Sequence, residues 1–420
     1  MTENTKVVVI GGGYAGVMAA NRLTQRDDAK VILINPRLMF VERIRLHQLV
    51  VGGSHDPVHH YREILGAGVR LVVDTVTRID AAERTVSMAT GDTVGYDYLI
   101  YAVGSGTADP RVPGAAKFAY PLGSLEEAQR LRPVVDAMPA TAAVTVVGAG
   151  PLGIEIAAEV AEAGHGVTLV CGEVLGRYLH PRGRRSVAKR LAGLGVAVLD
   201  GPDATATAVT RNAVQLTGGR MLPSDVTIWA GGFGVPDLAS RSGLSTDAMG
   251  RLLTDETLTS VDDVRIVAAG DSAAPSDLPL RMSCQAAGPL GSHAADTVLS
   301  RIAGEQPAPI SVGFAGMCIS LGRRAGIFQV ARTDDIARTL HVGGRPGAKL
   351  KEYFCSAAFE GLSKEARKPG SFSWFVKDDK RKQRLEAEPA EAPATAAPAR
   401  LDSIPGRPEV HRTKDLRGSA

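Results

Sequence analysis

The chain has 420 residues, of which 44% are hydrophobic and 22% are charged. This length allows two or three domains with sizeable cores, and the composition is that of a globular protein. The 48 basic and 45 acidic residues leave a net charge of +3, so no overall field favours nucleic acid as a partner. No apolar run approaches the ~20 residues needed to span a bilayer, and no apolar leader precedes the first strand. We expect a cytoplasmic protein.

The N-terminal region predicts a strand, a tight turn and a helix. The apolar run Val7 to Ile10 is followed by Gly11-Gly12-Gly13-Tyr14-Ala15-Gly16. In this context a G-x-G-x-x-G pattern brings a pyrophosphate to the helix N-terminus, whose free N–H groups and positive dipole end bind it. A side chain at the second of these glycines would hold the phosphate away. The pattern therefore predicts a dinucleotide at this turn.

A second strand, Lys30 to Ile34, ends at Asn35, where an acid usually bonds the adenosine ribose. The Asn35 amide either bonds a ribose hydroxyl or caps the turn before Pro36, and the sequence leaves both open. Residues 70–86 alternate in polarity as sheet does, and the strand within residues 96–103 leads into a glycine turn.

The same order of elements occurs a second time. After a helix around residues 125–138, the apolar run Val144 to Val147 is followed by Gly148-Ala149-Gly150-Pro151-Leu152-Gly153. A helix over residues 154–163 and a strand over 166–170 come next. Two such turns indicate two dinucleotides, most simply a flavin nucleotide and a nicotinamide nucleotide.

Two features of this second unit have alternative interpretations. Glu155 lies just inside the predicted helix, where it either complements the helix dipole or lies beside a nicotinamide. The following strand ends without a ribose-binding acid, at Cys171-Gly172-Glu173. The arginines downstream either pair with the 2′-phosphate of NADPH or form a solvated helix face, so the preference between NADH and NADPH stays open. They are Arg177, Arg182, Arg184 and Arg185.

The C-terminal third predicts a last buried strand over residues 264–271 that ends in Asp271, and a helix over residues 284–303. Residues 309–375 are expected to form short strands of a small third domain. Its basic, aromatic segment Lys349 to Phe375 either packs against the rest of the protein or lies on an anionic membrane surface. Beyond Lys377 the chain becomes Pro/Ala-rich, and we expect a disordered tail.

Cysteines and histidines show no metal or redox spacing. The cysteines are predicted to be buried, reduced thiols; they are Cys171, Cys284, Cys318 and Cys355. Several histidines occur close together but without the carboxylate or cysteine partners that metal sites need, so we predict no metal site. They are His47, His55, His59 and His60.

With these motifs the chain resembles the FAD-dependent pyridine nucleotide oxidoreductases, and within them the type II NADH dehydrogenases and oxidoreductases similar to apoptosis-inducing factor. The resemblance rests on both glycine turns, on YDYLIYAVGS (96–105) and on VRIVAAGD (264–271). It implies an α/β fold with two Rossmann-like domains, the second inserted in the first, plus a small C-terminal α+β domain. The implied boundaries are 1–108 and 255–306 for the FAD domain, 109–254 for the NAD(P)H domain, 307–376 for the C-terminal domain and 377–420 for the tail.

The resemblance also implies site residues. The FAD site would consist of Gly11, Gly13, Tyr14, Ala15, Gly16, Asn35, Arg43, Val76, Ala102, Gly104, Gly270 and Asp271, with Asp271 on the ribityl chain. The nicotinamide nucleotide site would consist of Gly148, Gly150, Gly153 and Gly231. Glu155, beside the nicotinamide, and Gln285 would be the catalytic residues.

The sequence departs from the family pattern in two places. Residues 40–48 lack the redox cysteine pair of the disulfide reductases, so no dithiol relay is available there. The quinone motif A-Q-x-A-x-Q is present only in part, with Gln285 but Pro289 at the last position. The resemblance thus implies electron transfer from NADH or NADPH through FAD to a quinone-like acceptor, on the cytoplasmic face of a membrane or free of it. The alternatives are a ferredoxin or rubredoxin reductase and a flavin-bearing nucleotide sensor; the oligomeric state, a dimer included, stays open.

Overall fold

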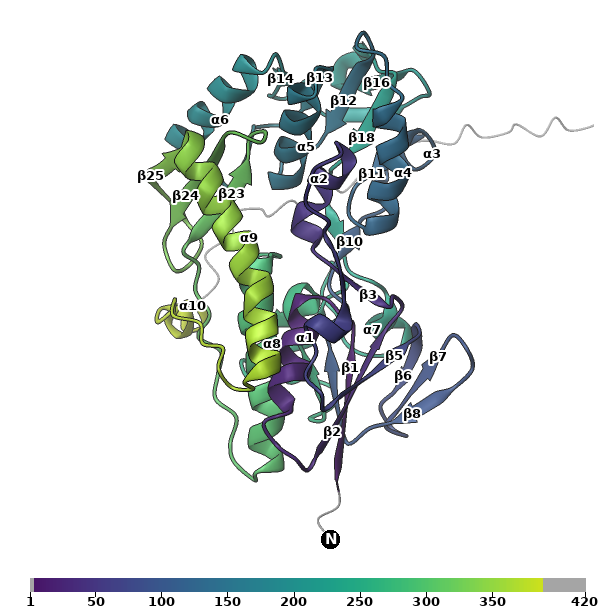
Figure 1. Cartoon of the computed structure of the whole chain (residues 1–420), viewed down its shortest axis with the longest axis vertical. Helices are drawn as coiled ribbons and strands as arrows, with labels where there is room; N and C mark the ends of the chain where they lie inside the picture. Colours follow the sequence, from purple (N-terminus) through teal and green to yellow (C-terminus); the bar gives the residue numbers. More distant parts are fainter. Residues whose placement is uncertain (1–3, 388–420) are drawn as a thin grey trace, which may run out of the picture. The chain divides into compact units, whose positions relative to one another are not determined.

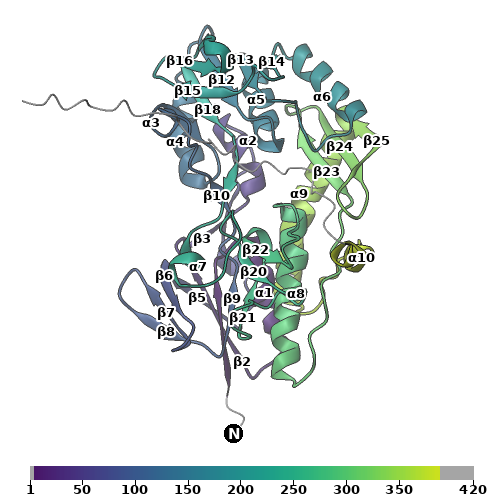
Figure 2. The ribbon, with the colours of Figure 1, turned by 180° about the vertical axis from the view of Figure 1, so that it is seen from behind.

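The computed structural model describes residues 4–387. The chain divides into one compact unit over Met1–Arg381 and a second over Lys382–Ala420. The fold below is that of the first unit, whose described residues form two five-stranded parallel sheets, three three-stranded antiparallel sheets and three two-stranded pairs. Figure 1 and Figure 2 show this unit from opposite sides.

The first sheet has the strand order β21-β9-β1-β2-β5. Its strands are β21 (Ile266–Ala268), β9 (Tyr98–Tyr101), β1 (Thr5–Ile10), β2 (Ala29–Asn35) and β5 (Val69–Val73). Val7 and Val9 of β1 are buried in one hydrophobic cluster, and Val8 and Ile10 in another, on the opposite face. A strand covered on both faces needs a continuous apolar run, which is why the buried part of β1, Val7 to Ile10, contains no polar residue.

Different elements cover the two faces (Figure 1). Helices α1 (Tyr14–Leu23) and α8 (Cys284–Ile302) pack together on one side. The other side carries the antiparallel sheet of β6 (Val76–Asp80), β7 (Thr85–Met88) and β8 (Thr93–Gly95). Small residues let α1 and α8 approach, because a Cβ at Gly291 would overlap the backbone of Ala15.

The second sheet has the order β11-β18-β12-β13-β14 and repeats the construction of the first. Its strands are β11 (Ala119–Pro121), β18 (Val226–Trp229), β12 (Ala143–Val147), β13 (Gly166–Val170) and β14 (Ala197–Leu199). Its helices are α4 (Leu125–Asp136), α5 (Pro151–Glu162) and α6 (Pro181–Gly193). All of these elements lie between β9 and β21 in the sequence, so a distant segment completes the first sheet.

Short elements connect the sheets. They include β3 (Met39–Val41), α2 (Leu46–Val50), β4 (Val58–His60), β10 (Gly106–Thr107), α3 (Ala115–Phe118), β15 (Ala206–Val209), β16 (Ala213–Leu216), β17 (Met221–Pro223), β19 (Phe233–Gly234), α7 (Leu238–Arg241), β20 (Leu252–Thr254) and β22 (Ala273–Pro275). The 3-10 turns are η1 (Arg43–Arg45), η2 (Tyr61–Glu63), η3 (Thr217–Gly219) and η4 (Gly270–Ser272).

The C-terminal region corrects one prediction. Only β23 (Gly316–Ser320), β24 (Gly326–Ala331) and β25 (Ala337–Gly343) are strands, and they form an antiparallel sheet. The expected continuation as short strands is wrong, because Gly344–Arg367 forms the 24-residue helix α9. Its apolar residues, among them Cys355, Phe359 and Leu362, recur every three or four positions, and this stripe packs against α1.

The predicted tail is helical at its start, where α10 covers Arg381–Glu386. Residues 388–420, for which disorder was predicted, lie outside the described residues. Among the described residues no helix combines the length and apolar character required to cross a membrane. The domain boundaries given above remain predictions.

Candidate functional site

The two glycine turns are built alike. Gly11 and Gly148 adopt φ values of +102° and +107°, a backbone conformation that side chains rarely allow. A Cβ at Gly16 would overlap the carbonyl oxygen of Gly11, and a Cβ at Gly153 would overlap that of Gly148. The first and third glycines of each turn are therefore required by packing between the helix and the strand.

The middle glycines differ from these, because they face open space. A Cβ at Gly13 or Gly150 would have no heavy atom within 4 Å. Each is the N-cap of its helix, α1 or α5, and neither helix has a side-chain cap. Free N–H groups and a positive dipole end thus face an open cradle, which suits the pyrophosphate of a dinucleotide.

Asn35 and Tyr61 hold the first turn from outside. Asn35 Oδ1 accepts a hydrogen bond of 2.9 Å from Gly12 N, and its Nδ2 donates one of 2.9 Å to the Arg37 carbonyl. The Tyr61 hydroxyl donates to the Gly12 carbonyl at 2.7 Å. The Asn35 amide therefore holds its own turn, and a bond to a ribose stays a prediction. Tyr61 was not predicted, and no local pattern marks it.

Asp271 lies where separate segments meet. Its carboxylate accepts hydrogen bonds from Ser105 Oγ at 2.7 Å and from Ser283 N at 3.1 Å. The turns beside it need glycine, because Gly104 and Gly270 have φ values of +68° and +69°. The structure thus brings together both motifs that were predicted to flank the flavin.

Arg43 approaches the same place from the loop after β3. Its Nε donates to the Gly123 carbonyl at 3.1 Å. Burial lowers the pKa of Arg43, and the nearby Asp271 carboxylate counteracts part of this shift. A partly buried cation beside Asp271 is a suitable partner for an anionic or electron-rich group.

The remaining predicted FAD residues are part of the core. The Tyr14 ring packs edge-on against Phe40, with centroids 5.1 Å apart, and its buried hydroxyl has no hydrogen-bond partner within the described residues. The Val76 side chain is buried in the hydrophobic cluster that also contains Val8 and Ile10 of β1, so a ligand could contact this residue only through its backbone. Ala102 directly follows β9, and its carbonyl oxygen packs against Gly11.

Two further predicted residues lie at loop and helix ends. The Gly231 carbonyl accepts a hydrogen bond of 3.0 Å from Trp229 Nε1, which fixes the turn after β18. Gln285 is the second residue of α8 and is partly exposed. The Ser283 side chain caps this helix by accepting from Ala286 N.

Glu155 is buried at a meeting point of four elements. Its Oε1 accepts hydrogen bonds from Ser320 N of β23 at 3.0 Å and from Lys351 Nζ of α9 at 2.8 Å. Its Oε2 lies 3.6 Å from His47 Nδ1 of α2. These partners lie outside α5, so Glu155 is not a cap of its own helix. Its place beside a nicotinamide remains a prediction.

The charges of this cluster, Glu155–Lys351–His47, follow from burial and pairing. Burial acts to raise the pKa of Glu155, but Lys351 and His47 bring it below its ordinary value. Burial lowers the pKa of Lys351, which Glu155 outweighs, so the pKa is raised. Burial lowers the pKa of His47 to about 4. The cluster thus holds a carboxylate and an ammonium beside a neutral imidazole.

Three cysteines that are far apart in the sequence surround this cluster. Cys284, Cys318 and Cys355 each interact electrostatically with Lys351. Burial raises the pKa of Cys318 to about 12 and that of Cys355 to about 11, so these groups stay protonated. Only Cys355 is fully buried. All three are free thiols, but the prediction that the cysteines are buried is wrong for Cys284 and Cys318, which are partly exposed.

Two histidines correct the prediction that they lack carboxylate partners. His55 Nε2 and His59 Nε2 lie 2.7 and 2.8 Å from Glu42 Oε1. His60 is exposed, whereas His47 belongs to the Glu155 cluster. Residues of the loop between β3 and β4 therefore form a group that their spacing did not reveal.

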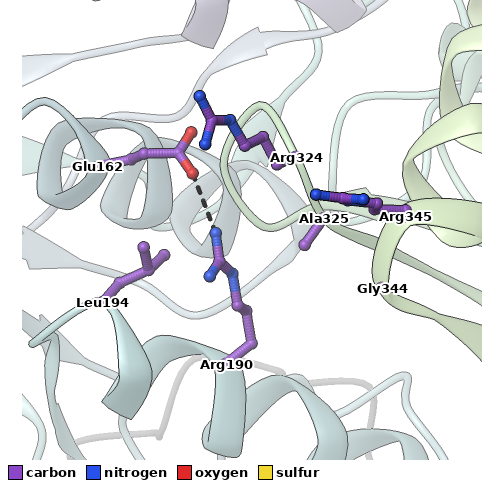
Figure 3. A pocket seen from close by; sticks show the side chains of 7 residues that line it. All are labelled: Glu162, Arg190, Leu194, Arg324, Ala325, Gly344 and Arg345. Carbon is purple, nitrogen blue, oxygen red and sulfur yellow. Dashed lines mark hydrogen bonds and ion pairs between the residues drawn. The ribbon is translucent and has the colours of Figure 1, made fainter.

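A pocket of about 490 Å³, shown in Figure 3, is lined by no residue of either glycine turn. It is lined by Glu162, Arg190, Leu194, Arg324, Ala325, Gly344 and Arg345. Within it, Arg190 and Glu162 form an ion pair of 2.9 Å. None of its lining residues is a predicted nucleotide ligand.

The structure does not decide whether the arginines before and within α6 bind a 2′-phosphate or only face solvent. Arg177 lies 3.9 Å from Glu173 in an exposed pair, and Arg182 and Arg185 are exposed. Arg184 donates to the Leu179 carbonyl at 3.3 Å. Exposed arginines are available to a 2′-phosphate and equally to solvent.

The chain is similar in sequence to proteins of known family. The model of the family described as pyridine nucleotide-disulphide oxidoreductase matches residues 5–291. The chain is 29% identical over 375 residues to an NADH dehydrogenase-like protein of Mycobacterium tuberculosis, covering 83% of this chain and 92% of that protein. It is also 29% identical over 350 residues to the type II NADH:quinone oxidoreductase Ndh of the same species, covering 72% and 74%.

More distant relatives include a probable ferredoxin reductase of Castellaniella defragrans, 26% identical over 292 residues, covering 64% of this chain and 68% of that protein. Among solved structures, sulfide:quinone oxidoreductase of Aquifex aeolicus matches with a TM-score of 0.75 and 18% identity, covering 86% of this chain and 92% of that one. NDH2 of Plasmodium falciparum matches with a TM-score of 0.71 and 15% identity, covering 87% and 99%. These structural matches agree with the predicted α/β fold.

Proposed function

Because the chain belongs to the pyridine nucleotide-disulphide oxidoreductase family, we propose that it is an FAD-dependent NAD(P)H dehydrogenase that passes electrons to a quinone-like acceptor. The observation that carries this proposal is the pair of matching glycine turns, each open at its middle glycine. One chain with two such cradles binds two dinucleotides. When bound, FAD supplies the redox chemistry, and the protein supplies position and electrostatics.

We assign the first cradle to FAD. Gly13 leaves the α1 N-terminus free for the pyrophosphate, and Asp271, held by Ser105 and Ser283, offers a carboxylate to the ribityl hydroxyls. Arg43 adds a partly buried positive charge in the same region. These residues fit the cofactor, since an open helix N-terminus and a held carboxylate are the groups that a dinucleotide requires.

The second cradle is assigned to NADH or NADPH. Gly150 leaves the N-terminus of α5 open in the same way, and Gly231 lies at the end of the neighbouring strand β18. The exposed arginines near α6 do not decide between the two nucleotides. The choice therefore belongs to experiment.

The acceptor has to approach the flavin directly, since residues 40–48 contain no cysteine pair to relay electrons. Reduction of a quinone to a quinol consumes two protons as well as two electrons. Lys351 is a poor donor of these protons, because its ion pair with Glu155 raises its pKa. The similarity of the chain to quinone-reducing relatives supports a quinone as the acceptor.

A ferredoxin-type reductase is the second candidate, supported by the likeness to ferredoxin reductases. The test is to purify the full chain, record its visible spectrum and titrate it anaerobically with NADH and with NADPH. The proposal expects a flavin spectrum that one nucleotide bleaches, followed by steady turnover with a soluble quinone.

Three other results of this experiment would contradict the proposal. Turnover with ferredoxin that is sensitive to salt, but none with quinone, would support the second candidate. A single stoichiometric bleaching without turnover would indicate a nucleotide sensor. A colourless protein that takes up no FAD would overturn the assignment of the first cradle.

We also propose peripheral binding to anionic membranes as the route to a lipid quinone. Tyr353 on α9 and Phe375 after it are 67% and 79% exposed, and basic residues occur on both sides of them. Flotation of the full chain with vesicles of anionic lipid tests this. Loss of flotation in a Tyr353→Ser/Phe375→Ser variant is expected, and equal flotation would contradict the proposal.

A further inference from the structure

Glu42, His55 and His59 form a cluster that no nucleotide site uses. Glu42 Oε1 lies 2.7 Å from His55 Nε2 and 2.8 Å from His59 Nε2. One oxygen or nitrogen from each residue lies within 4.8 Å of the others. Glu42 directly follows β3, His59 lies in β4, and His55 lies in the segment between these strands. Both imidazoles approach the same carboxylate oxygen, Glu42 Oε1.

The backbone fixes two of the three positions. Strands β3 and β4 are antiparallel, with Phe40 paired to His59, and Glu42 N donates to the Pro57 carbonyl at 2.8 Å. Glu42 and His59 are therefore placed by a hydrogen-bonded ladder. His55 reaches them from the connecting loop.

Neighbouring groups hold the cluster in position. Arg45 Nε lies 3.1 Å from Glu42 Oε2, the oxygen that faces away from the histidines. The Arg45 fork is itself bound by Glu352 at 2.9 and 2.7 Å. The His59 ring packs on Phe359 at 4.2 Å between centroids, and its Nδ1 lies 3.9 Å from Glu63 Oε2. Such outer partners orient ligands at metal sites.

The net charge of the groups around this cluster favours a bound cation. Glu42 and Glu352 both pair with the Arg45 guanidinium, and a third carboxylate, that of Glu63, faces His59 Nδ1. With neutral histidines the group carries two net negative charges, which a divalent ion balances.

We propose that Glu42, His55 and His59 bind a divalent transition-metal ion of the Zn²⁺ type. Two imidazole nitrogens and one carboxylate oxygen form a ligand set that Zn²⁺ accepts at about 2.0–2.2 Å, with a further position left to water. The ion replaces the two hydrogen bonds between the imidazoles and Glu42 Oε1, and the Nε2 atoms move apart slightly. Each neutral imidazole then carries its proton on Nδ1, and that of His59 faces Glu63.

Access and selectivity follow from the same residues. The Glu42 side chain is 2% exposed, whereas His55 is 39% exposed, so the ion and its water lie on the His55 side. Imidazole ligands favour zinc-like ions over Mg²⁺ and Ca²⁺. A bound ion fastens the loop between β3 and β4, and this revises the prediction from sequence that the chain has no metal site.

The test uses the full chain, stripped with a chelator and titrated with Zn²⁺ against a chromogenic competitor. We expect one tight site per chain, a rise in melting temperature with Zn²⁺, and no such rise with Mg²⁺. His55→Ala should lower the affinity by more than the ~10–100-fold typical of outer-partner losses. His60→Ala is the matched control, since His60 is exposed on the same strand and should leave the site unchanged.

His55→Ala removes a partly exposed side chain, and an unchanged melting temperature without metal would show that the variant folds. Glu42→Gln provides a second variant, tested the same way. The proposal is overturned if the unmodified chain binds Zn²⁺ no better than the His55→Ala variant, or if His60→Ala weakens binding as much. Flavin content and nucleotide turnover are read separately, so this outcome is independent of the proposed function.

Discussion

Lys351 Nζ lies 2.8 Å from Glu155 Oε1, and the side chains of the two residues are 12% and 6% exposed. The pair joins helix α9 of the C-terminal region to helix α5 behind the second glycine turn. Both charges are almost withdrawn from water, so each depends on the other to remain ionised.

Removing one member of this pair should destabilise the protein strongly. We expect Lys351→Met to cost ~3–5 kcal/mol in the free energy of unfolding, since Glu155 is left buried and unpaired. The double variant Glu155→Gln/Lys351→Met should recover part of this loss. Denaturant titration of both single variants and the double variant measures the coupling. Lys349→Met, at an exposed position of the same helix, is the control. A loss in Lys351→Met no larger than in this control contradicts the finding.

The glycine turns predict two distinct kinds of failure. Gly13→Ala should fold normally but bind less flavin, because its Cβ enters only the open cradle. Gly16→Ala should cost ~1–3 kcal/mol or more, since its Cβ overlaps the carbonyl oxygen of Gly11. Melting of flavin-free protein and flavin content after reconstitution separate the two. Equal melting temperatures for both variants would count against this assignment.

Glu159, one turn after Glu155, should make stability depend on pH. Burial raises the pKa of Glu159 from 4.5 to about 7, and its Oε1 has no hydrogen-bond partner within the described residues. Between these values the folded protein holds a proton that the unfolded chain has lost, so this residue's contribution falls as the pH rises.

We therefore expect Glu159→Gln to gain ~1–3 kcal/mol relative to the unmodified protein between pH 5 and pH 8. Unfolding free energies at both pH values measure the difference. Glu173→Gln, at an exposed carboxylate, is the control. A gain that is the same at both pH values would show that Glu159 does not titrate in this range.

Tyr61→Phe should weaken the first turn without emptying its core. The change removes the hydrogen bond to the Gly12 carbonyl and keeps the ring, so a cost of ~1 kcal/mol and weaker flavin retention are expected. Dissociation of flavin from each variant during dialysis is the measurement. Tyr353→Phe removes an exposed hydroxyl and should have no effect. Unaltered retention in Tyr61→Phe would remove this residue from the site.

The turns were predictable from sequence because their physics is local. The conformation of Gly11, the open position at Gly13 and the contact of Gly16 all arise within a few residues of one strand and helix. The same holds for the second turn. A repeated local pattern therefore predicted two matching cradles and the parallel sheets that carry them.

The Glu155 cluster was not predictable in this way. Ser320, Lys351 and His47 come from three separate segments, and none of them stands in a recognisable motif. Glu155 itself was found because it follows a glycine turn, whereas its partners are set by how β23, α9 and α2 pack on α5. The Glu42 cluster was missed for a similar reason, since it depends on the register between β3 and β4.

Helix α9 was missed because its first residues, Gly344 to Gly347, contain two glycines and a proline, which suggest a loop. The spacing of Cys355, Phe359 and Leu362 was the available signal of a helix, and the contact with α1 is what that spacing produces.

Strand β21 has a consequence for synthesis on the ribosome. It pairs with β9, yet every strand of the second sheet is translated between the two. During synthesis the first sheet cannot be completed until residue 268 has emerged, so one edge of β9 lacks its hydrogen-bonding partner until then. An unpaired strand edge readily captures other chains, so a product truncated after the second sheet should aggregate where the full-length chain does not.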